Sequence, residues 1–284
     1  DALSKSFSEM VTNCQNDHQK INFRFGVVIY RDLIGSQRTS GEKAKKPIIF
    51  DLTNNIDDIQ SFLNDYVPSG GSIKFATDWA CGYHSLLEDI SWDDSAEKVV
   101  IQISNTPGHG RRFTININWH KKYLDIPKFT GKSYFKKNFE IYRDLQQKQN
   151  GWLSFNISKL AEQGIKFYCL NGNKIALYCF KKVSHLYRKR GGKKFVIKDL
   201  FGYLVTDSED DSIDVDMLKD EIKNFVSNVV DSCSSVTEKD SENQFERKCN
   251  EKFNEDLNNF YKENKTNFRS ETTETDDDDD LDKD

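Results

Sequence analysis

Three nearly continuous apolar runs indicate that the chain buries strands on both of their faces. The runs are FRFGVVIYR at residues 23–31, KVVIQIS at 98–104 and IKFYCL at 165–170. Parallel strands covered by helices on both sides have this pattern, whereas half-exposed strands alternate apolar and polar residues. Shorter runs at 47–52 and 195–197 predict two further strands. The pattern therefore predicts a sheet at the centre of the molecule.

Segments with apolar residues at helical spacing separate these strands. Thr53-Asn54-Asn55 supplies an N-cap before the helix that begins at Ile56, and glycines at 164 and 191–192 end two later helices. The predicted helices cover residues 2–15, 56–67, 76–90, 154–163 and 174–190. Such alternation of strands and helices predicts an α/β fold, with a doubly wound, mostly parallel sheet flanked by helices.

After Gly202 the pattern changes to two amphipathic helices and an acidic end. The stripes of 217–229 and 245–260 lack sustained heptads, so these helices either pack together or join a partner. Segment 271–284, ETTETDDDDDLDKD, has too little apolar surface to order itself. We predict a domain at 1–202, a helical extension at 203–265 and a disordered acidic tail at 266–284.

Charge divides the chain in the same way. Residues 207–284 hold 26 acidic and 10 basic side chains, a formal charge of −16, whereas residues 1–206 hold 20 acidic and 31 basic, a formal charge of +11. Basic pairs among aromatic residues suit stacking on single-stranded nucleic acid, although a solvated basic surface has the same composition. The acidic tail would then compete with a polyanion for the basic body, or simply keep the protein in solution.

The residues offer no motif for catalysis or for a structural metal. The six cysteines include no Cys-x-x-Cys pair, and those in predicted core elements are expected to be free thiols that pack as small hydrophobes. No nucleophile elbow, Walker loop or His-Glu-x-x-His is present. No apolar run approaches the ~20 residues of a membrane span. We expect a cytoplasmic protein that is not an enzyme and holds no cofactor.

Several of these segments together resemble a von Willebrand factor type A (VWA) domain, of the kind found in protist alpha-kinase proteins. The similarity rests on GVVIYRD, IIFDLTNNIDDIQSFLNDYVPSGGS and KVVIQISNTPGHG, followed by LAEQGIKFYCL and LYRKRGGKKFVI. It covers roughly residues 1–200, more weakly over 113–150. Asp1-Ala2-Leu3 aligns with the family's first helix, so the first strand, which carries Asp-x-Ser-x-Ser, is absent from the chain. No kinase motif accompanies the resemblance.

The resemblance implies a metal-ion-dependent adhesion site at the carboxyl ends of the strands, but this chain departs from its pattern. Such sites hold Mg²⁺ through Asp-x-Ser-x-Ser, a Thr or Asp in the second loop and an Asp after the fourth strand. Here Lys74 falls near the second position and Asn105 replaces the last carboxylate. The site is therefore expected to be degenerate, and the oxygens that remain for a metal are those of Thr77, Asp78 and Asn105.

The leading hypothesis is therefore a non-catalytic protein-interaction module whose partner binds the loops at the sheet rim. His109, between two glycines, is either a residue that touches a ligand or an ordinary turn residue. The alternatives are a polyanion-binding protein regulated by its acidic tail, or the interaction part of a longer alpha-kinase-like protein. The loops span Asp32–Lys46, Ser69–Asp78 and Asn105–Arg112, and the expected partner-binding residues are Arg31, Asp32, Ser72, Lys74, Asn105, Thr106, His109 and Arg111.

Overall fold

A computed structural model of the chain describes residues 12, 16, 21–30, 47–65, 77–110, 113, 150–172, 176–200, 215–234 and 243–263. A helix over residues 150–162 follows β3. The other elements are β1 (Phe25–Ile29), β2 (Ile48–Thr53), α3 (Ile56–Asp65), α4 (Trp79–Glu88), β3 (Val99–Ser104), β4 (Lys166–Asn171), α7 (Ala176–Lys189), β5 (Phe195–Asp199), α9 (Val215–Ser234) and α10 (Gln244–Glu263).

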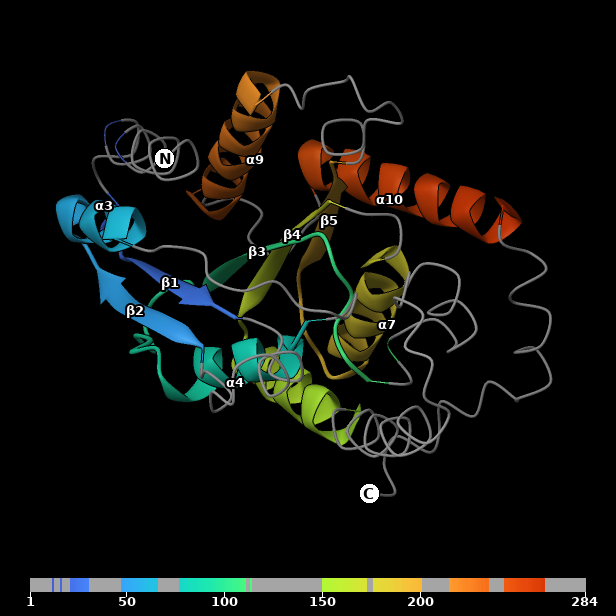
Figure 1. Cartoon of the computed structure of the whole chain (residues 1–284), viewed down its shortest axis with the longest axis horizontal. Coiled ribbons are helices and arrows are strands. Elements are labelled where there is room, and N and C mark those ends of the chain that lie inside the picture. The colour runs from blue at the N-terminus through green and yellow to red at the C-terminus, as the bar shows by residue number, and fades with distance from the viewer. Residues whose placement is uncertain are drawn as a thin grey trace, which may run out of the picture.

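A three-stranded parallel sheet, in the order β3-β4-β5, lies at the centre of the described structure (Figure 1). Its register places Ser104, Asn171 and Asp199 side by side at the carboxyl ends of the strands. Every residue of β4 is buried. This burial explains the unbroken apolar run of the central strand, because helices cover both of its faces.

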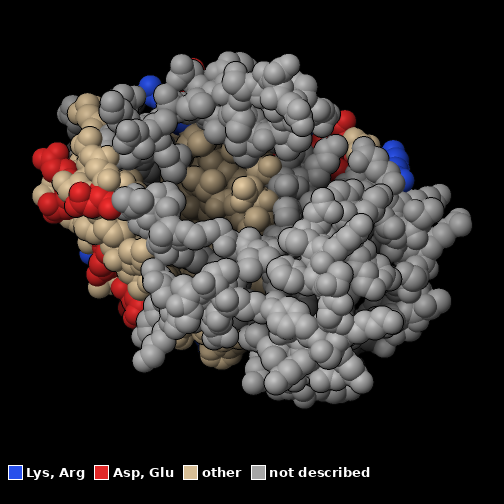
Figure 2. Space-filling model, in the orientation of Figure 1, with Lys and Arg blue, Asp and Glu red and all other residues tan. Residues whose placement is uncertain are grey.

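Strands β1 and β2 form a separate antiparallel pair. Tyr30, just after β1, packs against α4, where a Cβ at Gly82 would lie 3.0 Å from the ring of Tyr30, a tight contact. Within the described ranges, β1 and β3 do not pair with each other. Ile103 of β3 is 50% exposed, and Figure 2 shows an uncharged hollow over the part of the sheet where Figure 1 draws β3 and β4. Among the described residues, Ile103 of β3 thus exposes an apolar side chain next to this hollow.

Helices cover both faces of the parallel sheet (Figure 1). On one face, α4, the 150–162 helix and α7 bury a core that includes Trp79, Leu153, Phe167 and Phe180. On the opposite face, α9 packs its apolar stripe onto Tyr168 and its neighbours. Helix α10 lies along β5 and contributes to both clusters, through Phe253 on one side and Cys249 on the other. The two C-terminal helices are therefore packed on the sheet as well as on each other.

The structure confirms the α/β class and most of the predicted elements. Strands predicted at 98–104 and 165–170 are β3 and β4, and the helix predicted at 174–190 is α7. Asn55 accepts a hydrogen bond from the backbone of Asp57 at 3.1 Å, as expected of an N-cap for α3. The 150–162 helix starts four residues earlier than the predicted one. The helix predicted at 2–15 and the acidic tail fall almost wholly outside the described residues.

Candidate functional site

Thr77 ties the loop that follows β3 to the start of α4 at the carboxyl end of the sheet. The backbone N–H of Thr77 donates to the carbonyl of Pro107 at 2.9 Å, and the N–H of His109 donates to the carbonyl of Thr77 at 3.0 Å. The hydroxyl oxygens of Thr77 and Thr106 are 2.9 Å apart. Two residues predicted for the rim, 29 positions apart in the chain, are thus brought together.

Close packing makes this junction rigid. A Cβ at Gly108 would lie 2.9 Å from the Trp79 side chain, and Gly110 has a φ of 125°, which favours glycine. Trp79 is fully buried. His109 is 1% exposed, so its ring is part of the packed junction. The glycines on either side of His109 therefore serve a tight turn, which favours the turn interpretation of the histidine over direct contact with a ligand.

Asp78 caps helix α4. Its carboxylate accepts a hydrogen bond from the backbone N–H of Cys81 at 2.9 Å, and its side chain is completely buried. The negative charge also lies at the positive end of the helix dipole. Capping thus accounts for an acidic residue at this position without a metal.

The oxygens predicted for a metal make a poor site for Mg²⁺. Thr77 and Asp78 are neighbours, but Asn105 is exposed at the start of the loop. The set supplies a single carboxylate, which is closed to solvent and engaged by the helix cap, whereas Mg²⁺ keeps several waters and favours carboxylates. Among the described residues, no three His, Cys, Asp or Glu side chains gather closely enough to hold a metal ion.

The cysteines of the described regions are free thiols in apolar surroundings, as the sequence predicted. Burial, with a further contribution from the charge of Asp78, raises the pKa of Cys81 to about 12. Burial raises the pKa of Cys179 to about 12 and that of Cys249 to about 11. These thiols stay protonated at neutral pH and are poor nucleophiles.

A buried polar network lies beneath the rim. The hydroxyl of Tyr83 donates to Gln102 of β3 at 2.7 Å, and the amide of Gln102 reaches the hydroxyl of Tyr30 at 3.5 Å. Burial raises the pKa of both tyrosines, so their hydroxyls stay neutral and keep their hydrogen bonds. This network links the end of β1 to β3 through side chains, although these two strands do not pair within the described part of the chain.

The structure describes only part of the predicted binding surface. Asn105 is exposed and Thr106 half-buried, while His109 is buried. Arg31, Asp32, Ser72, Lys74 and Arg111 lie outside the described residues, as does the loop 32–46.

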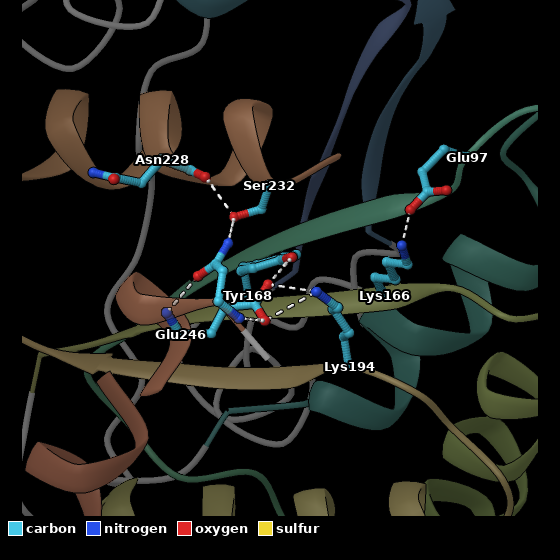
Figure 3. Close-up of polar contacts among 8 residues, drawn as sticks. Glu97, Lys166, Tyr168, Lys194, Asn228, Ser232 and Glu246 are labelled. Atoms are coloured by element: carbon cyan, nitrogen blue, oxygen red, sulfur yellow. Dashed lines mark hydrogen bonds and ion pairs between the residues drawn. The ribbon is translucent and has the colours of Figure 1, made fainter. Parts of the chain in front are cut away.

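A second polar centre, which the sequence did not predict, lies at the amino end of the sheet. Glu246 of α10 accepts hydrogen bonds from Lys194 at 2.8 and 2.9 Å and from the hydroxyl of Tyr168 at 2.9 Å (Figure 3). The Lys194 and Glu246 side chains are 5% and 2% exposed. Glu246 also forms a capping box with Asn243 at the start of α10. Figure 3 also shows the neighbouring pair of Lys166, the first residue of β4, and Glu97, which precedes β3.

A groove of about 670 Å³ opens beside this ion pair, between α7, β5 and α10. Its lining includes the exposed cationic side chains of Lys181, Arg188, Lys193 and Arg247. The carboxylates in the lining are those of Glu246, already paired with Lys194, and of Glu251. Cations therefore outnumber carboxylates around the opening.

Sequence reasoning missed this groove because its residues come from three segments. The basic clusters at 188–190 and 193–194 are visible in the sequence, but the sequence does not show that they lie beside the helix that begins at Gln244. The spacing of Asn243 and Glu246 is a visible capping-box signal. It marks the start of α10, yet nothing in it indicates which lysine the carboxylate meets.

The described helices include none with the length and apolar character that a membrane span requires. No protein-family model matches the chain, and no curated protein is significantly similar to it in sequence.

Proposed function

We propose that the chain is a non-catalytic protein-interaction module of the VWA type, with a degenerate adhesion site. The partner binds the rim formed by the loop after β3 and the start of α4. One observation carries the proposal: Thr77 holds that loop in a rigid arrangement that leaves Asn105 exposed and a hydroxyl pair beside it. Open α/β sheets bind their ligands at this end of the strands.

The arrangement of the strands supports the VWA part of the proposal. Among the described residues, the parallel set β3-β4-β5 and the antiparallel pair β1-β2 are not paired with each other (Figure 1). A doubly wound VWA sheet has a further strand at its centre, which would account for β1 and β3 not pairing with each other among the described residues. Helices on both faces of the parallel strands fit the same architecture.

The chemistry of the rim supports binding without catalysis. Its described groups are hydroxyls, an amide, a buried capping carboxylate and protonated thiols. A neutral, rigid surface of this kind recognises a partner by shape and hydrogen bonds.

The test compares two variants with the same change of side chain. Asn105→Arg places a bulky charge on the rim, and Asn224→Arg places it on the exposed side of α9. Proteins cross-linked to the wild-type chain in a native extract are identified, and the purified partner is titrated against both variants with and without EDTA. We expect Asn105→Arg to weaken binding at least tenfold, Asn224→Arg to leave it unchanged, and EDTA to have no effect.

Equal binding by both variants would overturn the rim as the interface. Loss of binding in EDTA would overturn the degenerate site. Calorimetry of the chain with Mg²⁺ and Mn²⁺ adds an independent readout, in which we expect no heat of binding for the wild type.

A further inference from the structure

The groove between α7, β5 and α10 combines an open cationic lip with a closed apolar floor. Lys181, Arg188, Lys193 and Arg247 are exposed at the lip. Beneath them lie the buried side chains of Phe195, Val196, Ile197, Phe253 and Leu257. A low-dielectric floor strengthens the field of charges above it, so anions are attracted to the groove more strongly than to a flat basic surface.

The ion pair of Lys194 and Glu246 adds no net charge to the groove, so the exposed side chains of the lining set the sign of the field. Because Glu246 is buried against Lys194, its charge is compensated inside the protein. The remaining carboxylate in the lining is that of Glu251, against four exposed cations. Helix α10 also begins beside the groove, so the positive end of its dipole adds to the same sign.

We propose that this groove binds a run of carboxylates, and that its occupant is the acidic segment 271–284 of the same chain. This segment holds five consecutive aspartates, Asp276–Asp280, with further acidic residues on both sides. Its charge is opposite to that of the lip. The site lies at the amino end of the sheet and is independent of the rim proposed above.

The chain is long enough to make this contact. Helix α10 lines the groove from Glu246 onward and ends at Glu263. At ~1.5 Å per residue, the helix carries the chain about 25 Å beyond Arg247. The residues between Glu263 and Asp276 span up to about 40 Å when extended, which is enough to return to the groove.

The floor favours carboxylates over nucleic acid. Single-stranded nucleic acids bind through exposed aromatic rings on which bases stack. The phenyl rings of the lining, those of Phe195 and Phe253, are 2% and 6% exposed and belong to the hydrophobic core, so His185 carries the one exposed ring among the lining residues. The groove thus offers an anionic ligand positive charge and hydrogen-bond donors, but a single imidazole instead of a row of rings on which successive bases could stack.

The test uses the full chain with its acidic segment neutralised by replacing Asp276–Asp280 with Asn. A fluorescent peptide of residues 271–284 is titrated against it and followed by anisotropy. In this background, Lys193→Glu with Arg247→Glu alters the groove. Lys189→Glu with Lys248→Glu makes the same change of charge at neighbouring residues outside the lining.

We expect the peptide to bind the neutralised chain. Its affinity for the groove variant should be at least tenfold lower, and its affinity for the control variant should stay within twofold of that for the neutralised chain. Binding to the unmodified chain is expected to be at least tenfold weaker, since a tethered segment competes at an effective concentration in the millimolar range. Raising the salt concentration should weaken all of these interactions.

Three results would overturn the proposal. The first is equal affinity of the peptide for the groove and control variants. The second is equal affinity for the unmodified and the neutralised chain. The third is displacement of the labelled peptide by a single-stranded oligonucleotide of equal charge at a lower concentration than unlabelled peptide requires. If the groove variant melts at a lower temperature than the wild type, the single variant Lys193→Gln replaces it, and Lys189→Gln serves as the control.

Discussion

The two ends of the parallel sheet use polar groups in different ways. At the carboxyl end, hydroxyls, backbone amides and one capping carboxylate hold a tight loop against α4, and an exposed amide remains at the surface. At the amino end, Lys166 and Lys194 are buried and paired with Glu97 and Glu246. The carboxyl end holds no buried ion pair among the described residues and can change its exposed residues at little cost, whereas the amino end cannot lose one member of a buried pair without leaving the other charge unpaired.

The largest expected effect therefore belongs to the amino end. Glu246→Ala would leave the Lys194 ammonium buried without its carboxylate, and we expect the free energy of unfolding to fall by about 3–5 kcal/mol. Urea unfolding measures this loss. Glu251→Ala, an exposed change on the same helix, is the control and should alter stability by less than about 0.5 kcal/mol.

Replacing both partners tests whether the loss comes from the unpaired charge. The double variant Lys194→Met/Glu246→Leu keeps apolar volume and strands no charge, so most of the lost stability should return. A double variant as unstable as Glu246→Ala would show that the ion pair is not the reason.

At the rim, the packing of Gly108 is expected to be the most sensitive feature. In Gly108→Ala, the new methyl group would lie 2.9 Å from the buried Trp79 side chain, and we expect a loss of about 1–3 kcal/mol in thermal or urea unfolding. Gly151→Ala has open space within 4 Å and should leave stability unchanged or raise it. Equal effects at the two glycines would contradict a rigid junction at the rim.

The helix cap at Asp78 is expected to contribute less. Asp78→Ala removes the acceptor for the Cys81 amide and should cost about 0.5–2 kcal/mol. Asp78→Asn keeps an acceptor oxygen, so it should lose less than half as much. If the two variants are equally destabilised, the charge rather than the hydrogen bond is the important feature.

The sequence predicted what depends on local pattern. The positions of β3, β4 and α7 followed from apolar runs and glycine stops, because a strand buried on both faces has few alternatives. The contact of Lys194 with Glu246, separated by 52 residues, did not follow, because both look like surface charges in sequence. Similarly, Thr77 and Thr106 were each predicted at the rim, but only the fold shows that their hydroxyls meet.

The smallest expected effect concerns the thiol beneath the rim. Burial and the charge of Asp78 raise the pKa of Cys81 to about 12, whereas burial holds Cys249, on α10, at about 11. Asp78→Asn removes the charge but not the burial, so the pKa of Cys81 should fall without reaching its ordinary value of about 8.5. Alkylation of Cys81 by iodoacetamide, followed by mass spectrometry from pH 7 to 11, should therefore begin at lower pH in the variant.

The shape of this pH profile separates electrostatics from loosened structure. A lower pKa moves the profile along the pH axis, with about tenfold more thiolate for each unit of pKa at a pH below both values. Local opening would instead raise the rate at every pH by a common factor. Cys249 serves as the internal control, because Asp78 is not among the charges that influence it. An unmoved Cys81 profile would mean that the Asp78 carboxylate acts at the rim only as a helix cap, without a measurable electrostatic effect on the neighbouring thiol.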